Sequence, residues 1–309
     1  MENREPGAVP DPLRRFPPQK IVVPVDFSEA SQAALDVAVS LGRRWQSQLS
    51  LIHINELPPP SPFGGTYETR GLGEEDRHYH VLLARAQAMA ADYPAISVRV
   101  EDGYAMSALS TLAESGSADL IVMGTHGREG LPRFILGSNA ESVVHAARSP
   151  VLTVHAKPAA EWPRRILVPM KLSDYADKAL LYALALADSV KAKISMLCVC
   201  ENVSEEEASF GLLAEHLPSL LGKERYAELG RIIAVGRPAE AVLRAVEREE
   251  FDLVVLAAHK KPFWESLVLG TTAERVLRHC RVPVLSIPSI EAAALRTEKK
   301  ESPGVAVWK

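Results

Sequence analysis

Three glycines and a serine in the first half of the chain have a spacing that could bind a phosphate. The segment GTHG runs from Gly124 to Gly127, and after nine more residues Gly137-Ser138 precedes an alanine-rich stretch with helical spacing. A glycine lets the backbone approach a ligand closely because it has no Cβ. A helix start presents unbonded N–H groups and partial positive charge. The pattern therefore predicts a phosphate-binding segment, to which the Ser138 hydroxyl adds a donor.

A second candidate is Asp26, which lies in the segment PVDFSE after an apolar run. This turn contains no glycine, so it is not the G-x-G-x-x-G turn of dinucleotide-binding proteins. A Walker A loop is also excluded, because Gly222-Lys223 is followed by Glu224. Asp26 could bind a ligand at the end of a strand, or it could start the next turn together with Ser28.

These residues must be positioned by alternating strands and helices. Short apolar runs alternate with helical periodicity, which is typical of βαβ units and a parallel sheet. Ser28 is expected to cap the first helix, with Glu29 in its first turn. Ligands bind beyond the carboxyl ends of such strands, at the point where the strand order reverses. In the first half we expect strands at Lys20–Val25, Leu49–Asn55, Ser97–Glu101, Leu120–Thr125 and Val151–His155.

The chain repeats itself. The block from Lys20 to Glu56 matches the block from Arg165 to Glu201, with a proline, a serine and an Ala/Leu-rich helix at corresponding positions. Later in each repeat, ADLIVMGTHG corresponds to FDLVVLAAHK, and LGSNAESVVHAARSPVLTVH corresponds to LGTTAERVLRHCRVPVLSIP. Such long matches in the same order indicate an internal duplication.

The predicted fold is α/β, with two tandem Rossmann-like domains. Each domain is expected to be a five-stranded parallel, doubly wound sheet flanked by helices. The domains are assigned to residues 20–157 and 164–288, separated by a proline-containing segment. Residues 1–19 and 289–309 have the composition of flexible tails.

The spacing G-x-x-G-x9-G-S, preceded by VPVDFS and followed by SPVLTV, resembles the ATP-binding subgroup of the universal stress protein family. The resemblance covers nearly the whole chain as a tandem pair. It implies that the motif after the fourth strand wraps the ribose and phosphates of ATP, while Asp26 contacts the adenosine end. It also implies pairing of the last strands of two domains, here within one chain. A bound phosphate chain carries a divalent ion readily, so Mg²⁺ is expected as its companion. The implied site consists of Pro24, Val25, Asp26, Ile54, Met123, Gly124, Gly127, Gly137, Ser138 and Asn139.

The second repeat departs from this motif at three positions. Ala257 replaces Gly124, Lys260 replaces Gly127, and Lys171 replaces Asp26. If these glycines adopt left-handed conformations, a Cβ there costs about 1–2 kcal/mol. The lysine at the position of Asp26 changes an acceptor into a donor. We therefore expect ATP in the first repeat only, although a different anion could bind near the lysines of the second.

Composition limits the alternatives. The 309 residues carry a formal net charge of −4, which gives no electrostatic reason to expect nucleic acid or an anionic membrane as partner. The N-terminus lacks the apolar stretch of a signal peptide, and three cysteines suit a reducing compartment. These features favour a cytoplasmic protein. Cys198 and Cys200 are expected to be buried as small hydrophobes, because their spacing is not that of a zinc knuckle.

Three functions remain open. The first is a regulatory ATP-binding protein, for which the resemblance implies a role in stress adaptation. The second is a slow ATPase. Efficient phosphoryl transfer needs a positioned base and charge-neutralising groups, and because no such set is recognised in the sequence, no catalytic residue is assigned. The third is an assembly module or apolar-ligand module that binds no nucleotide. Oligomeric state is not specified, and a homodimer of the whole chain is compatible with the sequence.

Overall fold

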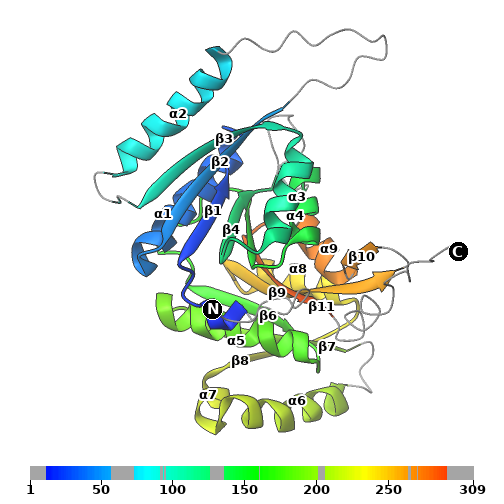
Figure 1. Cartoon of the computed structure of the whole chain (residues 1–309). Coiled ribbons are helices and arrows are strands. Elements are labelled where there is room, and N and C mark those ends of the chain that lie inside the picture. The colour runs from blue at the N-terminus through cyan, green and yellow to red at the C-terminus, as the bar shows by residue number, and fades with distance from the viewer. Residues whose placement is uncertain are drawn as a thin grey trace, which may run out of the picture.

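The computed structural model describes residues 12–56, 73–90, 93, 95–125, 136–159, 161–200, 206–263, 266–269 and 271–290. Across these residues the two repeats build one eleven-stranded sheet in the order β3-β2-β1-β4-β5-β11-β9-β6-β7-β8, with β10 paired to β9 (Figure 1). Each repeat thus supplies five parallel strands in the same relative order, which confirms the predicted fold class.

The strand bounds lie close to those expected from the sequence. In the first repeat they are β1 (Lys20–Pro24), β2 (Gln48–Glu56), β3 (Ile96–Gly103), β4 (Leu120–Gly124) and β5 (Val151–Val154). In the second repeat they are β6 (Arg165–Met170), β7 (Lys193–Cys200), β8 (Gly230–Val235), β9 (Leu253–Phe263), β10 (Ser266–Leu269) and β11 (Val284–Ile290).

Helices cover both faces of the sheet (Figure 1). One buried cluster packs α1 (Glu29–Trp45) and α5 (Asp174–Val190) on one face, and a second packs α3 (Ala105–Ser115) and α4 (Ser138–Ala146) on the other. None of the described helices is long and apolar enough to cross a membrane. The remaining helices are α2 (Gly73–Ala90), α6 (Glu206–Leu221), α7 (Lys223–Glu228), α8 (Pro238–Arg248) and α9 (Thr271–His279).

The first helix of each repeat begins and ends in the same way. Ser28 caps α1 and Ser173 caps α5, each accepting a hydrogen bond from the backbone N–H three residues later, at 3.1 and 3.4 Å. At the other end Gln46 and Lys191 adopt left-handed conformations with φ of 57° and 60°. The predicted cap at Ser28 is confirmed, and the duplication extends to local backbone geometry.

A carboxylate also fixes the start of the first strand in each repeat. Asp119 Oδ2 accepts hydrogen bonds from the backbone N–H groups of residues 19 and 20, at 3.1 and 3.0 Å. Asp252 accepts bonds from the corresponding N–H groups of residues 164 and 165, both at 2.9 Å. Each aspartate precedes a central strand, so it ties the beginnings of two adjacent strands together.

The N-terminal segment differs from the expectation of a tail over residues 1–19. A 3-10 helix, η1 (Pro12–Arg15), is followed by Phe16, whose ring contacts those of Trp45 and Tyr182 edge-on at centroid distances of 5.6 and 5.2 Å. An aromatic residue thus anchors a segment whose composition indicates mobility. The structure also extends β11 to Ile290, and the other residues assigned to the two tails lie outside the described part of the chain.

The two repeats meet where β5 runs antiparallel to β11. The register pairs Val284 with Thr153, Leu285 with Leu152 and Ser286 with Val151. The Thr153 hydroxyl donates to the carbonyl oxygen of Val284 at 3.1 Å. We call this strand pair the seam. Because corresponding residues of the two repeats face one another around Leu152 and Leu285, the seam has approximate two-fold symmetry.

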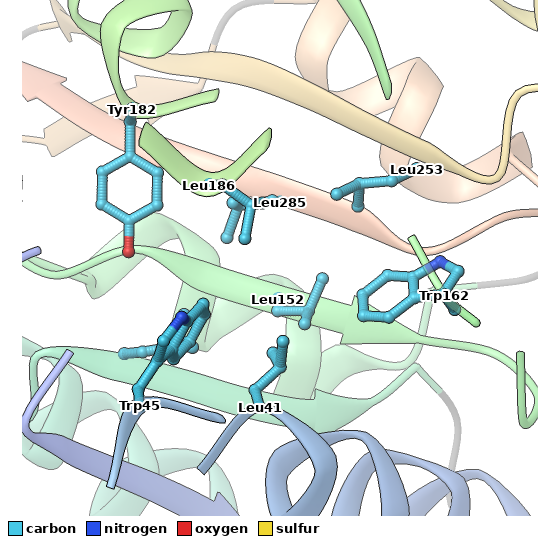
Figure 2. Close-up of a pocket in the computed structure, with 9 residues that line it drawn as sticks. Leu41, Trp45, Leu152, Trp162, Tyr182, Leu186, Leu253 and Leu285 are labelled. Atoms are coloured by element: carbon cyan, nitrogen blue, oxygen red, sulfur yellow. The ribbon is translucent and has the colours of Figure 1, made fainter. Parts of the chain in front are cut away.

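A small apolar pocket lies beside the seam, between the first helices of the two repeats (Figure 2). The hydroxyl of Tyr182 is buried there without a hydrogen-bond partner among the described residues. Burial raises the pKa of this phenol, and the nearby charge of Asp119 raises it further. The pocket is lined by Leu41, Trp45, Leu120, Leu152, Trp162, Tyr182, Leu186, Leu253 and Leu285.

Tyr182→Phe is expected to stabilise the protein by about 1 kcal/mol, because it removes a buried hydroxyl whose desolvation is uncompensated. The gain should widen above pH 10, the ordinary tyrosine pKa. Above this pH the phenol of the unfolded wild-type chain loses its proton, while the phenol of the folded protein keeps it. The wild-type protein therefore loses stability as the pH rises, and the Tyr182→Phe variant, which has no phenol at this position, does not. Urea unfolding at neutral and alkaline pH measures both effects. Leu285→Ala, with an expected loss of about 2–5 kcal/mol, serves as the destabilising control.

Candidate functional site

The sequence-predicted site residues come from three segments at the carboxyl edge of the first repeat. β1 lies between β2 and β4, so the chain that leaves β1 starts at the point where the strand order reverses. Pro24 and Met123 are buried near the ends of their strands, and Ile54 is half-buried near the end of β2. Val25 follows β1 directly and donates its backbone N–H to the carbonyl oxygen of Ile52 at 2.8 Å. The structure therefore gathers these four apolar residues along one edge of the sheet.

Asp26 organises the turn into α1. Its Oδ1 atom accepts hydrogen bonds from the backbone N–H and the hydroxyl of Ser28, at 3.0 and 2.6 Å. The Ser28 hydroxyl in turn accepts the Ser31 N–H at the start of the helix. The turn-starting role considered for Asp26 is therefore present. The bonds to Ser28 fix the Asp26 carboxylate at the edge of the sheet. Contact of this carboxylate with a ligand stays a prediction.

Phe27 is held in an uncommon conformation between these two polar residues. Its φ of 66° lies in the left-handed region, which bulky side chains rarely adopt and which costs about 1–3 kcal/mol. The ring lies 4.9 Å from that of His53, and the Arg85 guanidinium lies 5.3 Å above it. His53 Nδ1 lies 2.7 Å from the carbonyl oxygen of Val25, so this nitrogen carries the proton.

This aromatic and basic cluster was missed by the sequence analysis. Phe27, His53 and Arg85 come from a turn, a strand and a helix that are far apart along the chain. Their residue types do not indicate that they meet, and phenylalanine gives no signal of a left-handed backbone. The cluster supports the backbone on both sides of Asp26.

Gly124 is required for a different reason from the one expected. It is not among the described glycines with positive φ, so the left-handed explanation is wrong for this residue. A Cβ at this position would lie 2.8 Å from the backbone carbonyl carbon of Ala30 and 2.8 Å from the backbone nitrogen of Ser31. The glycine therefore lets α1 begin directly against the end of β4, and this close approach brings the Asp26 turn next to the fourth strand.

The segment after β4 is described only at its two ends. Thr125 donates its N–H to Val154, and its carbonyl oxygen accepts the Gly137 N–H at 2.5 Å. The Thr125 hydroxyl also lies 2.8 Å from Nδ1 of the buried His155. These bonds hold the two described ends of the segment together. Gly127 lies outside the described residues, as do His126, Arg128 and Arg133.

The predicted helix start after this loop is confirmed. Gly137 caps α4 with φ of −70° and ψ of 155°, an extended conformation open to any residue. The first intrahelical bond runs from the Glu141 N–H to the Gly137 carbonyl at 3.0 Å, so the N–H groups of Ser138 and Asn139 precede it. Ser138 is exposed and Asn139 is half-buried. The start of α4 can therefore present backbone donors to an anion.

The second repeat has a hairpin directly after the position that corresponds to the end of β4. β9 continues past Ala257 and turns back as β10, pairing Lys260 with Leu269 and Lys261 with Val268. On its other side β9 pairs with β11 as far as Lys260. Ala257, at the position of Gly124, lies within this regular pairing, opposite Ile287 of β11. The sequence analysis predicted a degenerate site here but no hairpin.

The cysteines are buried, as predicted. Cys198 and Cys280 are no more than 4% exposed, and burial raises the pKa of each thiol to about 11. A thiol with such a pKa stays protonated at neutral pH and is a poor nucleophile. The described residues contain no group of three histidine, cysteine or acidic side chains that could hold a metal ion.

Comparison with known proteins identifies the same two units. A model described as the universal stress protein family matches residues 18–155 and 163–288. A universal stress protein of Mycolicibacterium smegmatis is 26% identical over 284 residues, covering 86% of this chain and 96% of that relative. A second universal stress protein, from Methanocaldococcus jannaschii, is 34% identical over 141 residues, covering 44% of this chain and 81% of its own.

A solved structure has the same fold across both repeats. The crystal structure of a universal stress protein from Archaeoglobus fulgidus is 20% identical and superposes with a TM-score of 0.69. It covers 88% of this chain and 99% of its own chain.

Gly124→Ala is expected to lower the free energy of unfolding by about 1–3 kcal/mol, because the added Cβ would collide with the first turn of α1. The corresponding change in the second repeat, Ala257→Gly, serves as the control and should cost only about 0.5–1 kcal/mol through added backbone freedom. Urea unfolding of the two variants measures the difference. Equal losses would contradict the assignment of a special packing role to Gly124.

Proposed function

Because the chain belongs to the universal stress protein family, we propose that it is a regulatory ATP-binding protein whose first repeat holds one nucleotide. Its second repeat holds none. The bound nucleotide sets the conformation or partner choice of the protein, and stress adaptation in the cytoplasm is the role that family membership suggests.

The observation that carries this proposal is that two polar features lie at the same carboxyl edge of the first-repeat sheet. The Asp26 carboxylate is fixed by Ser28 at the end of β1, and α4 begins at Ser138 on the far side of β4. Gly124 allows the helix after Asp26 to approach β4 closely. A ligand with a polar nucleoside at one end and phosphates at the other matches such an arrangement.

In this proposal each end of the ligand has its own set of residues. Asp26 accepts hydrogen bonds from the adenosine end, and the start of α4 receives the phosphates. Mg²⁺ arrives with the phosphate chain, which supplies most of its ligands. The base lies against apolar residues, and the whole proposed set is Pro24, Val25, Asp26, Ile54, Met123, Gly124, Gly127, Gly137, Ser138 and Asn139.

The second repeat would serve as a structural partner of the first. Lys171 is exposed at the position of Asp26, and the β9–β10 hairpin follows the position of Gly124. We infer that the seam joins the two repeats in solution as it does here, in place of pairing between separate chains. Hydrolysis of ATP, if it occurs, is slow, and we assign no catalytic residue.

Protein purified without added nucleotide is expected to release about one adenine nucleotide per chain on denaturation, and the Gly127→Lys variant is expected to release none. Anion-exchange chromatography of the supernatant measures the number of nucleotides released per chain. Titration of the purified protein with ATP detects a site whose nucleotide was lost during purification. Two nucleotides per chain would show that the second repeat is competent. No nucleotide and no binding on titration would refute the proposal and leave a paired scaffold as the better account.

Ser138→Asp should weaken ATP binding by about tenfold or more, because it places a carboxylate beside the proposed phosphate position. The same carboxylate interacts favourably with the dipole of α4 at its N-terminus, so the helix itself should not lose stability. Thr271→Asp makes the corresponding change at the start of α9 and is the matched control. Calorimetric titration with ATP and with adenosine measures both variants. Unchanged ATP affinity in Ser138→Asp would contradict the assignment of the phosphates to α4.

A further inference from the structure

An ion pair connects the second repeat to the helix proposed to receive the phosphates. Arg278, in the last turn of α9, donates from Nη2 to Glu141 Oε1 at 2.6 Å. Glu141 lies in the first turn of α4. The side chains are 39% and 28% exposed, so the contact is partly shielded from water. A partly shielded charge pair is screened less by salt than one at the open surface.

The duplication shows that this contact is asymmetric. Glu274 of α9 corresponds to Glu141 of α4, and Arg278 corresponds to His145. Arg278 also lies 3.2 Å from Glu274, so one arginine serves both corresponding carboxylates. The cation at this contact thus comes from the repeat whose own motif is degenerate.

α4 and the second repeat also share apolar packing. Val143 and Val144 of α4 lie in the same buried cluster as Val276 and Leu277 of α9. The hairpin strand β10 lies against α4 as well. Two elements of the second repeat, α9 and β10, therefore contact α4 in addition to its neighbour α3.

A carboxylate in the first turn of α4 has opposite effects on the helix and on an anionic ligand. The negative charge of Glu141 interacts favourably with the helix dipole. The same charge repels phosphates that approach the same turn. Arg278 offsets this repulsion, because its guanidinium is always charged and is held directly at the carboxylate.

We propose that Arg278 of the second repeat tunes the affinity of the first-repeat site for the phosphates of its ligand by neutralising Glu141. This inference rests on the proposed function and extends it. The second repeat, although it binds no nucleotide, contributes a positioning residue that sets the charge of the phosphate site. A movement of α9 away from α4 would then weaken ATP binding without any change in the site residues themselves.

The test compares ATP with adenosine, which lacks the phosphates. In Arg278→Met the Kd for ATP should rise about three- to tenfold, whereas the Kd for adenosine should stay within about twofold of that of the wild-type protein. The increase should shrink as salt concentration rises. Arg275→Met removes the same charge from an exposed position on the same helix and is the matched control. Calorimetric titration measures both ligands.

Two further variants separate charge from packing. The double variant Arg278→Met/Glu141→Gln should regain ATP affinity close to that of the wild-type protein, because no unpaired carboxylate remains on α4, although Glu274 of α9 has lost its partner as well. Arg278→Lys should keep most of the affinity, because it keeps the charge. Circular dichroism and thermal unfolding establish that each variant is folded.

The outcomes distinguish this inference from the proposed function. If the wild-type protein binds ATP and the Arg278→Met variant binds it with the same Kd, this inference is overturned and the proposed function stands. Equal weakening of ATP and adenosine, without recovery in the double variant, would also overturn it and indicate a packing role for the arginine. A wild-type protein that binds neither ligand would overturn the proposed function and this inference with it.

Discussion

The antiparallel pairing of β5 with β11 is the interaction on which the rest of the structure depends. Without it, β5 and β11 would each be an edge strand with one side unpaired, and their side chains are mostly apolar, which favours aggregation. The pairing satisfies the backbone groups of both strands and buries Leu152 against Leu285. It also brings α4 and α9 into one apolar cluster, which places the charged contact between them beside the candidate site.

The two repeats show how duplicated segments diverge while their scaffold is kept. Caps, strand starts and left-handed helix ends are the same in both copies, because they stabilise the fold whatever the ligand. The segment after the fourth strand is where the copies differ. In the second repeat alanine and lysine replace Gly124 and Gly127, and the chain continues there as the β9–β10 hairpin. Strand hydrogen bonds in the second repeat therefore extend beyond the position at which β4 ends in the first.

Much of the fold could be predicted from the sequence, because apolar periodicity and the internal repeat report directly on burial. The positions of the strands, the Ser28 cap and the start of α4 at Ser138 follow from such local signals. The site was predicted less completely. The reason for Gly124 is a contact with backbone atoms of α1, and the positive φ of Phe27 depends on surroundings built by His53 and Arg85. Ordered packing of Phe16 was missed because proline-rich composition says nothing about distant aromatic partners.

The short connection between β5 and β6 has a consequence for the composition of the assembled molecule. Two halves on separate chains would associate according to their concentrations and would form random combinations of intact and degenerate copies. A covalent connection gives each half a local concentration of its partner in about the millimolar range, whatever the dilution. Every molecule then contains one half of each kind in a fixed ratio. A copy that lost a ligand in such a chain would never pair with another of its own kind, and it could evolve as a support for its partner.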